Sequence, residues 1–267
     1  MIVNGRKKIL DLHPTWFKKI TPWKPLLPWN YGKASVNTWA VGNILAYVNG
    51  KILQTLETDS VATSCIGHSL GSHVCGFFGK MSKKLVPKVE VDKIMGLDPA
   101  GPIFDYTGQD KSLRLDKDDA KSVEIFHTNS KMYGYRDPIG DVDFYINGGN
   151  YQFGRNKSIS EQRQNTLSGK SHSYSVELFT HLQNIYVPCY AKWKCNISKG
   201  SDLLDILDEN RIDLESKHCF ETSSNVSLGD LDDLHTNQSG VYWIDIDEDS
   251  KTCQYDRGIF NISRHVI

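Results

Sequence analysis

The sequence lacks a long apolar run and an excess of charge of either sign. No stretch approaches the ~18 uninterrupted apolar residues of a spanning helix, so we expect no transmembrane segment. The formal net charge of -1 leaves no basic stripe to neutralise phosphates, which argues against a nucleic-acid partner. An internal repeat and a low-complexity tract are also missing. A length of 267 residues with 39% hydrophobic content predicts a single domain over residues 1–267.

The start of the chain has no segment of the kind that directs export. Met1 to Lys8 carry charge and no apolar h-region follows them. Asn-x-Ser sequons nevertheless exceed the roughly two or three expected by chance and indicate an extracellular protein. These sequons are Asn156, Asn196, Asn225, Asn237 and Asn261. We therefore expect a secreted protein whose signal peptide is not part of this sequence, because the sequence is a mature form or is shortened at its start.

The cysteines fit no CxxC-type zinc pattern. Cys65 and Cys75 lie in a predicted strand and a predicted helix, where a small apolar side chain suffices, so we expect inert core thiols there. The other four are Cys189, Cys195, Cys219 and Cys253, in a polar, loop-rich part of the chain. They predict two disulfides in any of three pairings.

Apolar periodicity divides the first two thirds of the chain into alternating helices and strands. Apolar residues at three- and four-residue steps predict helices over residues 34–56, 70–81 and 173–185. The apolar face of the first helix consists of Val41, Ile44, Leu45, Val48, Ile52 and Leu53. Strands are expected over residues 61–66, 91–97 and 122–127. This alternation predicts an α/β fold with a mostly parallel central sheet flanked by helices, whose catalytic groups gather at the carboxyl ends of the strands.

The strongest chemical signal is a G-x-S-x-G motif between the strand at 61–66 and the helix at 70–81. It consists of Gly67, His68, Ser69, Leu70 and Gly71. A nucleophilic serine must project from a sharp, strained turn, and glycines two residues to either side leave room for that turn. The motif predicts that Ser69 is a nucleophile. The alternative is a serine that merely caps the following helix.

A hydroxyl nucleophile needs a base, and the base needs a carboxylate that orients it. Asp98 is the expected carboxylate, because it ends the next strand and precedes a Pro-Ala-Gly-Pro turn. His127 and His172 are the candidates for the base. One ends a strand and the other begins a helix, and spacing alone leaves both open.

Several segments together resemble the pancreatic-lipase family. The matching runs are residues 66–74 (IGHSLGSHV), 95–102 (MGLDPAGP), 114–120 (RLDKDDA), 127–128 (HT) and 141–149 (DVDFYINGG). The resemblance extends over roughly residues 23–182. It implies an α/β-hydrolase fold with Ser69 as nucleophile, Asp98 as acid and His172 as base, since residues 171–175 (SHSYS) take the place of the family's histidine motif. It also implies that the backbone N–H of Leu70 contributes to an oxyanion hole and that His127 is structural.

Two short loops resemble the phospholipase A1 branch of that family, which includes insect venom enzymes. The connection at 129–139 is short, the lid-like loop at 155–170 is moderate, and the chain has no room for the C-terminal β-sandwich of many relatives. The resemblance implies a secreted, monomeric enzyme without a cofactor that cleaves the sn-1 acyl ester of phospholipids at a membrane or micelle surface. Alternatives are a triacylglycerol or galactolipid lipase, and a non-catalytic or weakly active lipid-binding homologue.

Four departures from the family pattern affect these expectations. The lid-like loop has no disulfide, and Tyr174 replaces an arginine of the histidine motif. Lys111 stands in the calcium-binding loop where a carboxylate is expected, beside Arg114, Asp116 and Asp119, so we assign no metal. The family's His-Gly oxyanion motif is represented at most by His13, so the first strands of the sheet are expected to be missing or degenerate. Losing one oxyanion donor costs on the order of a hundred- to a thousandfold in turnover.

Overall fold

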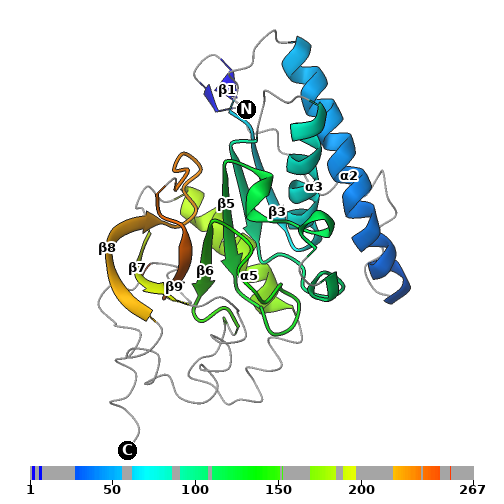
Figure 1. Ribbon diagram of the computed structural model, residues 1–267. Helices are drawn as coiled ribbons and strands as arrows, with labels where there is room; N and C mark the ends of the chain where they lie inside the picture. The colour runs from blue at the N-terminus through cyan, green and yellow to red at the C-terminus, as the bar shows by residue number, and fades with distance from the viewer. Residues whose placement is uncertain are drawn as a thin grey trace, which may run out of the picture.

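The computed structural model describes residues 28–55, 62–85, 91–107, 110–150, 169–184, 189–196, 219–235 and 237–246, with residues 2–3, 6–7, 152 and 253 in addition. Its centre is a seven-stranded sheet with the strand order β3-β4-β5-β6-β9-β7-β8 (Figure 1). These strands are β3 (Ser64–His68), β4 (Lys93–Leu97), β5 (Ser122–His127), β6 (Val142–Ile146), β7 (Tyr190–Cys195), β8 (Cys219–Ser227) and β9 (Gly240–Ile244). The first four strands and β9 run parallel, whereas β7 is antiparallel to both β9 and β8.

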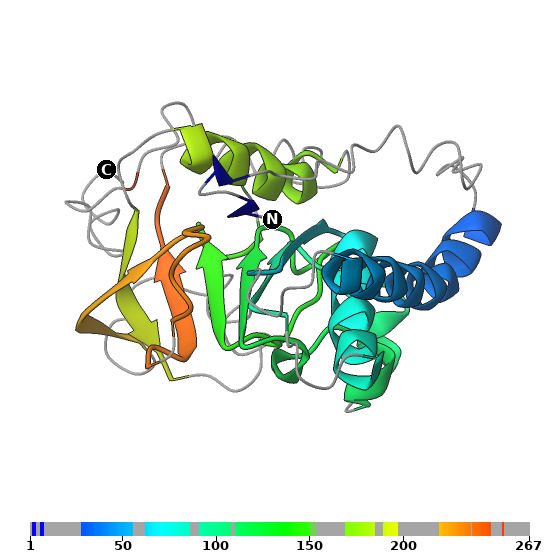
Figure 2. The same cartoon turned by 90° about the horizontal axis from the view of Figure 1, so that it is seen from above.

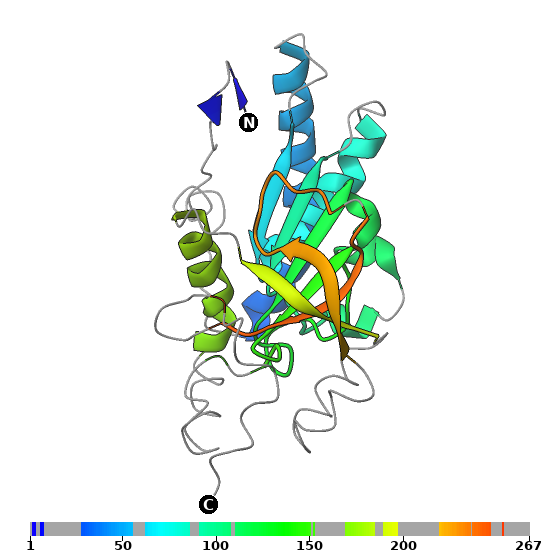
Figure 3. The same cartoon turned by 90° about the vertical axis from the view of Figure 1, so that its left-hand side faces the viewer.

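Helices cover both faces of this sheet. α2 (Pro28–Thr55) and α3 (Leu70–Leu85) lie together on one face, and α5 (Lys170–Asn184) lies on the other (Figures 2 and 3). β1 (Ile2–Val3) and β2 (Arg6–Lys7) form a separate antiparallel pair. The predicted α/β class, with a mostly parallel sheet between helices, is confirmed. No helix in the described ranges is apolar over a length that could cross a membrane.

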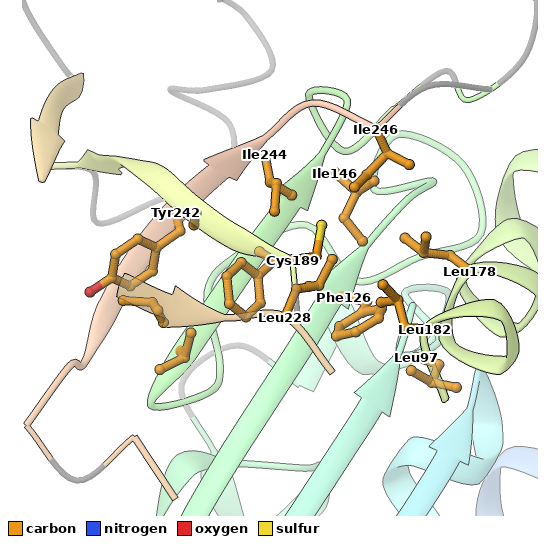
Figure 4. Packing of buried hydrophobic residues seen from close by; sticks show 14 of the residues in the cluster. Leu97, Phe126, Ile146, Leu178, Leu182, Cys189, Leu228, Tyr242, Ile244 and Ile246 are labelled. Atoms are coloured by element: carbon orange, nitrogen blue, oxygen red, sulfur yellow. The ribbon is translucent and has the colours of Figure 1, made fainter. Parts of the chain in front are cut away.

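Alternating side chains along the strands form one hydrophobic core on each face of the sheet. In β4 and β5, Ile94, Val123 and Ile125 pack in the cluster that contains residues of α3. Leu97 and Phe126 point to the opposite face and pack with Leu178 and Leu182 of α5 (Figure 4). This two-sided burial is typical of parallel strands and explains why apolar residues of β4 and β5 occur at both odd and even positions.

The first strand of the seven carries the G-x-S-x-G motif and lies at the edge of the sheet. Within the described residues β3 pairs only with β4, through the register Ser64↔Lys93 to His68↔Leu97. The segment around His13, on which the expectation of degenerate first strands rests, lies outside the described residues, as does the lid-like loop from residue 155 to 168.

The long first helix is confirmed, but its predicted apolar face is only partly buried, with Leu53 5% exposed. Ile44 and Val48 of the expected apolar face are 61% and 45% exposed. Ser35, Thr38 and Ala46 are buried instead. These small side chains let α2 approach α3 so closely that a Cβ on Gly42 would lie 2.6 Å from the Cβ of Phe77. Close packing of small residues against α3, together with Leu45 and Leu53, therefore sets the orientation of α2.

All six cysteines are paired, which corrects one expectation. Cys65 of β3 and Cys75 of α3 form a disulfide with Cα atoms 5.7 Å apart, and they are not free thiols. The turn at Ser69 folds α3 back along β3 and brings the two residues together. The predicted two disulfides in the last part of the chain are confirmed as Cys189–Cys253 and Cys195–Cys219.

A buried ionic network ties the β8–β9 connection to the amino-terminal half of the sheet. Lys93 Nζ lies 2.8 Å from Glu124 Oε2, and both side chains are fully buried. Glu124 Oε2 also contacts His235 Nε2 at 3.1 Å, and Asp233 Oδ2 lies 3.1 Å from His235 Nδ1. The Lys93 ammonium donates to the backbone carbonyls of Asp230 and Asp233 as well. Each buried charge therefore has several partners, as burial requires.

The network makes stability depend on pH. Burial by itself would lower the pKa of His235, but the hydrogen bond to Glu124 and the charges of Glu124 and Asp233 outweigh burial and the Lys93 charge and raise it above 6.5. Burial would raise the pKa of Glu124, but Lys93 and His235 bring it below 4.5. His235 therefore stabilises the fold fully below pH 6.5, and Glu124 does so above pH 4.5.

We expect the contribution of this network to the free energy of unfolding to be greatest between pH 4.5 and 6.5. It decreases as the pH rises through the raised pKa of His235. His235→Gln should lower stability at pH 6 by ~1.5–3 kcal/mol, because a charged hydrogen bond is lost, and should remove the alkaline decrease. Urea unfolding across pH 4 to 9 measures both effects. If the stability of His235→Gln decreases with rising pH as much as that of the wild type, the assignment of this decrease to His235 is contradicted.

The Cys65–Cys75 disulfide should stabilise the turn that it encloses. Replacing both cysteines by alanine should lower the free energy of unfolding by ~2–4 kcal/mol and should reduce the hydrogen-exchange protection of residues 64–72. The matched control is Cys195→Ala with Cys219→Ala, in a disulfide of β7 and β8. Loss of protection at residues 64–72 in the control as well would show that the effect is global.

Candidate functional site

Ser69 occupies the sharp turn that the motif predicts. β3 ends at His68, α3 begins at Leu70, and Ser69 between them has a φ of 56°. That left-handed conformation is rare for a residue with a side chain and is strained. A Cβ on Gly67 would lie 2.2 Å from the carbonyl oxygen of Gly71, which explains the first glycine of the motif. A Cβ on Gly71 meets no described atom within 4 Å, so the expected steric role of the second glycine is not supported.

Asp98 directly follows β4 and is fully buried. Its Oδ1 accepts hydrogen bonds from the backbone N–H groups of Thr128 at 2.8 Å and Asn129 at 3.0 Å. Its Oδ2 lies 2.6 Å from Nδ1 of His172. Both oxygens of the carboxylate therefore face hydrogen-bond donors. The donor at Oδ2 is the side chain of His172, 74 positions further along the chain.

His172 lies in the first turn of α5 and is partly exposed. Because a carboxylate faces Nδ1, that nitrogen carries the proton in the neutral ring and Nε2 is left with its lone pair. A lone pair at Nε2 is what a general base uses to accept a proton from a hydroxyl. Of the two histidines that spacing left open, the structure joins His172 to Asp98.

The ring of His127 is engaged elsewhere. It is fully buried, with Nε2 at 2.8 Å from Asp143 Oδ1 and Nδ1 at 3.1 Å from the carbonyl of Tyr135. It also stacks on Tyr145 with ring centroids 4.2 Å apart. With both nitrogens occupied inside the core, His127 holds the connection after β5 and has no access to Ser69 as a base.

His68, which precedes the turn at Ser69, contacts His172 of α5. Its Nε2 lies 3.1 Å from the carbonyl oxygen of His172, and the two rings are 4.5 Å apart. Within the described part of the chain, no hydrogen bond joins the hydroxyl of Ser69 to His172. Burial and the neighbouring His172 lower the pKa of His68 to about 4, so the His68 ring is neutral near pH 7.

The backbone N–H of Leu70 lies at the amino-terminal end of α3. The first four N–H groups of a helix have no acceptor within it, and the helix dipole favours negative charge there. An oxyanion that forms beside Ser69 could accept from this N–H group.

Asp116, Asp118 and Asp119 are paired with cations. Lys80 Nζ lies 2.5 Å from Asp119, and Lys111 Nζ lies 3.2 Å from Asp116. Arg114 contacts Asp116 at 3.3 Å. Calcium needs several free oxygen ligands and no ammonium group beside them, so these residues do not fit the metal that the family resemblance implies.

Sequence analysis missed the part of the site that holds Asp98. The donors at Thr128 and Asn129 are backbone groups, which carry no sequence signal of their own. Gly134 packs directly on the carboxyl group: a Cβ there would lie 2.5 Å from Asp98 Oδ1. The short connection at 129–139, which was recognised from its length alone, therefore encloses the carboxylate. Tyr133 in this connection places its ring 5.7 Å from that of His172.

Comparisons with known proteins agree with the geometry. A family model described as Lipase matches residues 20–181. The chain is 46% identical over 125 residues to phospholipase A1 of Vespula squamosa, covering 46% of this chain and 40% of that protein. It is 39% identical over 150 residues to lipase member H of Oryctolagus cuniculus (56% and 31%) and 33% identical over 189 residues to hepatic triacylglycerol lipase of Rattus norvegicus (64% and 37%). The matched segments thus span less than half of each relative.

Gly134→Ala should displace the Asp98 carboxyl group from His172, because the added Cβ overlaps Oδ1. The expected result is loss or broadening of the downfield ¹H resonance of His172 Nδ1–H, with a destabilisation of ~1–3 kcal/mol. Gly71→Ala is the matched control, since its Cβ meets no described atom within 4 Å. A wild-type resonance in Gly134→Ala would contradict the packing of Gly134 on Asp98.

Proposed function

The chain belongs to the lipase family and has its α/β-hydrolase fold, and on that premise we propose that it hydrolyses acyl esters of lipids through Ser69, His172 and Asp98. The observation that carries the proposal is the hydrogen bond of 2.6 Å between His172 Nδ1 and the buried Asp98, beside the strained turn at Ser69. Nucleophile, base and carboxylate follow the chain order serine, acid, histidine that α/β-hydrolases use.

The proposed reaction proceeds through an acyl-enzyme. His172 Nε2 takes the proton of Ser69 Oγ while the oxygen attacks the ester carbonyl carbon, and Asp98 stabilises the imidazolium that forms. The N–H of Leu70 stabilises the negative oxygen of the tetrahedral intermediate. His172 then donates its proton to the departing alcohol. Water, deprotonated by the same nitrogen, releases the fatty acid and restores Ser69.

The lack of a hydrogen bond between Ser69 and His172 in the described part of the chain is compatible with this role. Hydrogen bonds of catalytic groups are often long or absent in the free protein and tighten when substrate binds. The side chain of His172 is partly exposed, and the ring of Tyr133 lies 5.7 Å from its ring.

For the substrate we propose a phospholipid, cleaved at its sn-1 ester. A short connection at 129–139 resembles that of phospholipases A1 and would leave space for a charged head group, and the relative from Vespula squamosa is named phospholipase A1. A triacylglycerol substrate is the second candidate, favoured by the similarity to hepatic triacylglycerol lipase. The three disulfides and the sequons support an extracellular site of action.

Ser69→Ala should abolish fatty-acid release from phosphatidylcholine vesicles, because no other group can form the acyl intermediate, while the far-UV spectrum stays unchanged. Ser64→Ala is the control, at an exposed serine of the same strand. Vesicles labelled separately at the sn-1 and sn-2 chains identify the ester that is cleaved, and triolein emulsions test the second candidate.

An organophosphonate ester tests the mechanism independently of the lipid chosen. It should label Ser69, and labelling should stop in His172→Ala. If Ser69→Ala still releases fatty acid as the wild type does, the assignment of Ser69 as nucleophile is refuted. Absence of both release and labelling in the wild type would identify a non-catalytic homologue.

A further inference from the structure

The position of His172 depends on contacts outside the Ser69, His172 and Asp98 set. β3 lies at one edge of the sheet and α5 covers one of its faces, so Ser69 and His172 are held by different elements (Figure 3). Asp98 fixes Nδ1 of the His172 ring but does not fix the backbone from which that ring extends. A small shift of the first turn of α5 would change the direction of Nε2. A productive geometry needs tolerances of about 0.5 Å.

Two side chains hold the backbone of His172. Its carbonyl oxygen lies 3.0 Å from the hydroxyl of Ser175 and 3.1 Å from Nε2 of His68. Ser175 belongs to the same helix turn and cannot set the position of α5 relative to β3. His68 belongs to β3 and directly precedes Ser69. The contact from His68 therefore joins the backbone of the base to the strand of the nucleophile.

We propose that His68 is a positioning residue, which holds His172 within reach of Ser69 by donating its Nε2–H to the His172 carbonyl and packing its ring against the His172 ring. A carbonyl oxygen can only accept, so the proton of neutral His68 resides on Nε2. The inference rests on the proposed function, because it assigns His68 a role in bringing that base to that nucleophile.

A neutral His68 suits this location. During the proposed reaction His172 becomes an imidazolium, and a second cation 4.5 Å away would oppose that charge. The pKa of His68, lowered to about 4 by burial and by His172, keeps the ring uncharged over the range in which the base works. His68 thus combines a hydrogen-bond donor and an aromatic surface without adding charge.

The test separates the donor from the ring with two variants. His68→Phe keeps a ring and removes the donor, whereas His68→Gln retains an N–H donor at a similar reach. Loss of one neutral hydrogen bond should lower kcat and the rate of Ser69 labelling by an organophosphonate about tenfold in His68→Phe. KM should change less than about twofold, and His68→Gln should keep at least a third of the wild-type rate. The downfield resonance of His172 Nδ1–H should broaden in His68→Phe and persist in His68→Gln.

A measurement on the wild-type protein tests the same contact even if His68→Phe fails to fold. ¹⁵N-edited spectra at pH 7 should show His68 as a neutral ring protonated at Nε2. A charged ring, or a ring protonated at Nδ1, would overturn the inference. If His68→Phe is labelled at the wild-type rate and its His172 Nδ1–H resonance is unchanged, the inference about His68 is overturned. The proposed function then remains intact. If the wild type is not labelled at all, the proposed function fails, and the spectra still decide whether the His68 contact exists.

Discussion

The buried carboxylate of Asp98 is the constraint on which the site depends. A carboxylate without solvent is stable only if hydrogen bonds replace the lost water. Asp98 obtains them from Thr128, Asn129 and His172, in two segments distant from it in the sequence. The end of β4, the connection after β5 and the first turn of α5 therefore converge on one side chain. The Asp98 carboxylate that holds these elements together would also orient a base.

A second buried carboxylate, that of Asp143, positions the connection that binds Asp98. Asp143 of β6 accepts from His127 at 2.8 Å and from the backbone N–H groups of Ile139 and Gly140 at 3.0 Å each. It thus fixes both ends of the connection that supplies the donors to Asp98. Lys93 and Glu124 fix the β8–β9 connection in the same way. Apolar alternation determines the layers of this fold, and buried polar groups determine where the connections between them lie.

Local signals in the sequence were sufficient for β3, β4 and β5, the serine turn and the place of Asp98, whereas β6, β7, β8 and β9 were not predicted. The strand at 122–127 was predicted with its observed ends, although Glu124 interrupts its apolar residues Val123, Ile125 and Phe126. The choice between His127 and His172 required a family resemblance, since the deciding contacts, with Asp143 and with Asp98, join residues far apart in sequence. Cys65–Cys75 was missed for a similar reason: each thiol alone looks like a core residue. The burial of α2 was predicted only in part, because close helix packing buries small residues such as Ala46 and leaves Ile44 and Val48 exposed.

The strained conformation of Ser69 persists because its surroundings determine it from several directions. A residue in the left-handed region costs on the order of 1–3 kcal/mol and relaxes unless its neighbours prevent it. Ser69 N–H donates to the carbonyl of Leu97, and Ser72 Oγ donates to the carbonyl of Gly67. Cys65–Cys75 joins the strand to the helix across the same turn. Since these contacts involve neither oxygen nor hydrogen of the Ser69 hydroxyl, the turn is rigid while the hydroxyl itself remains free to react.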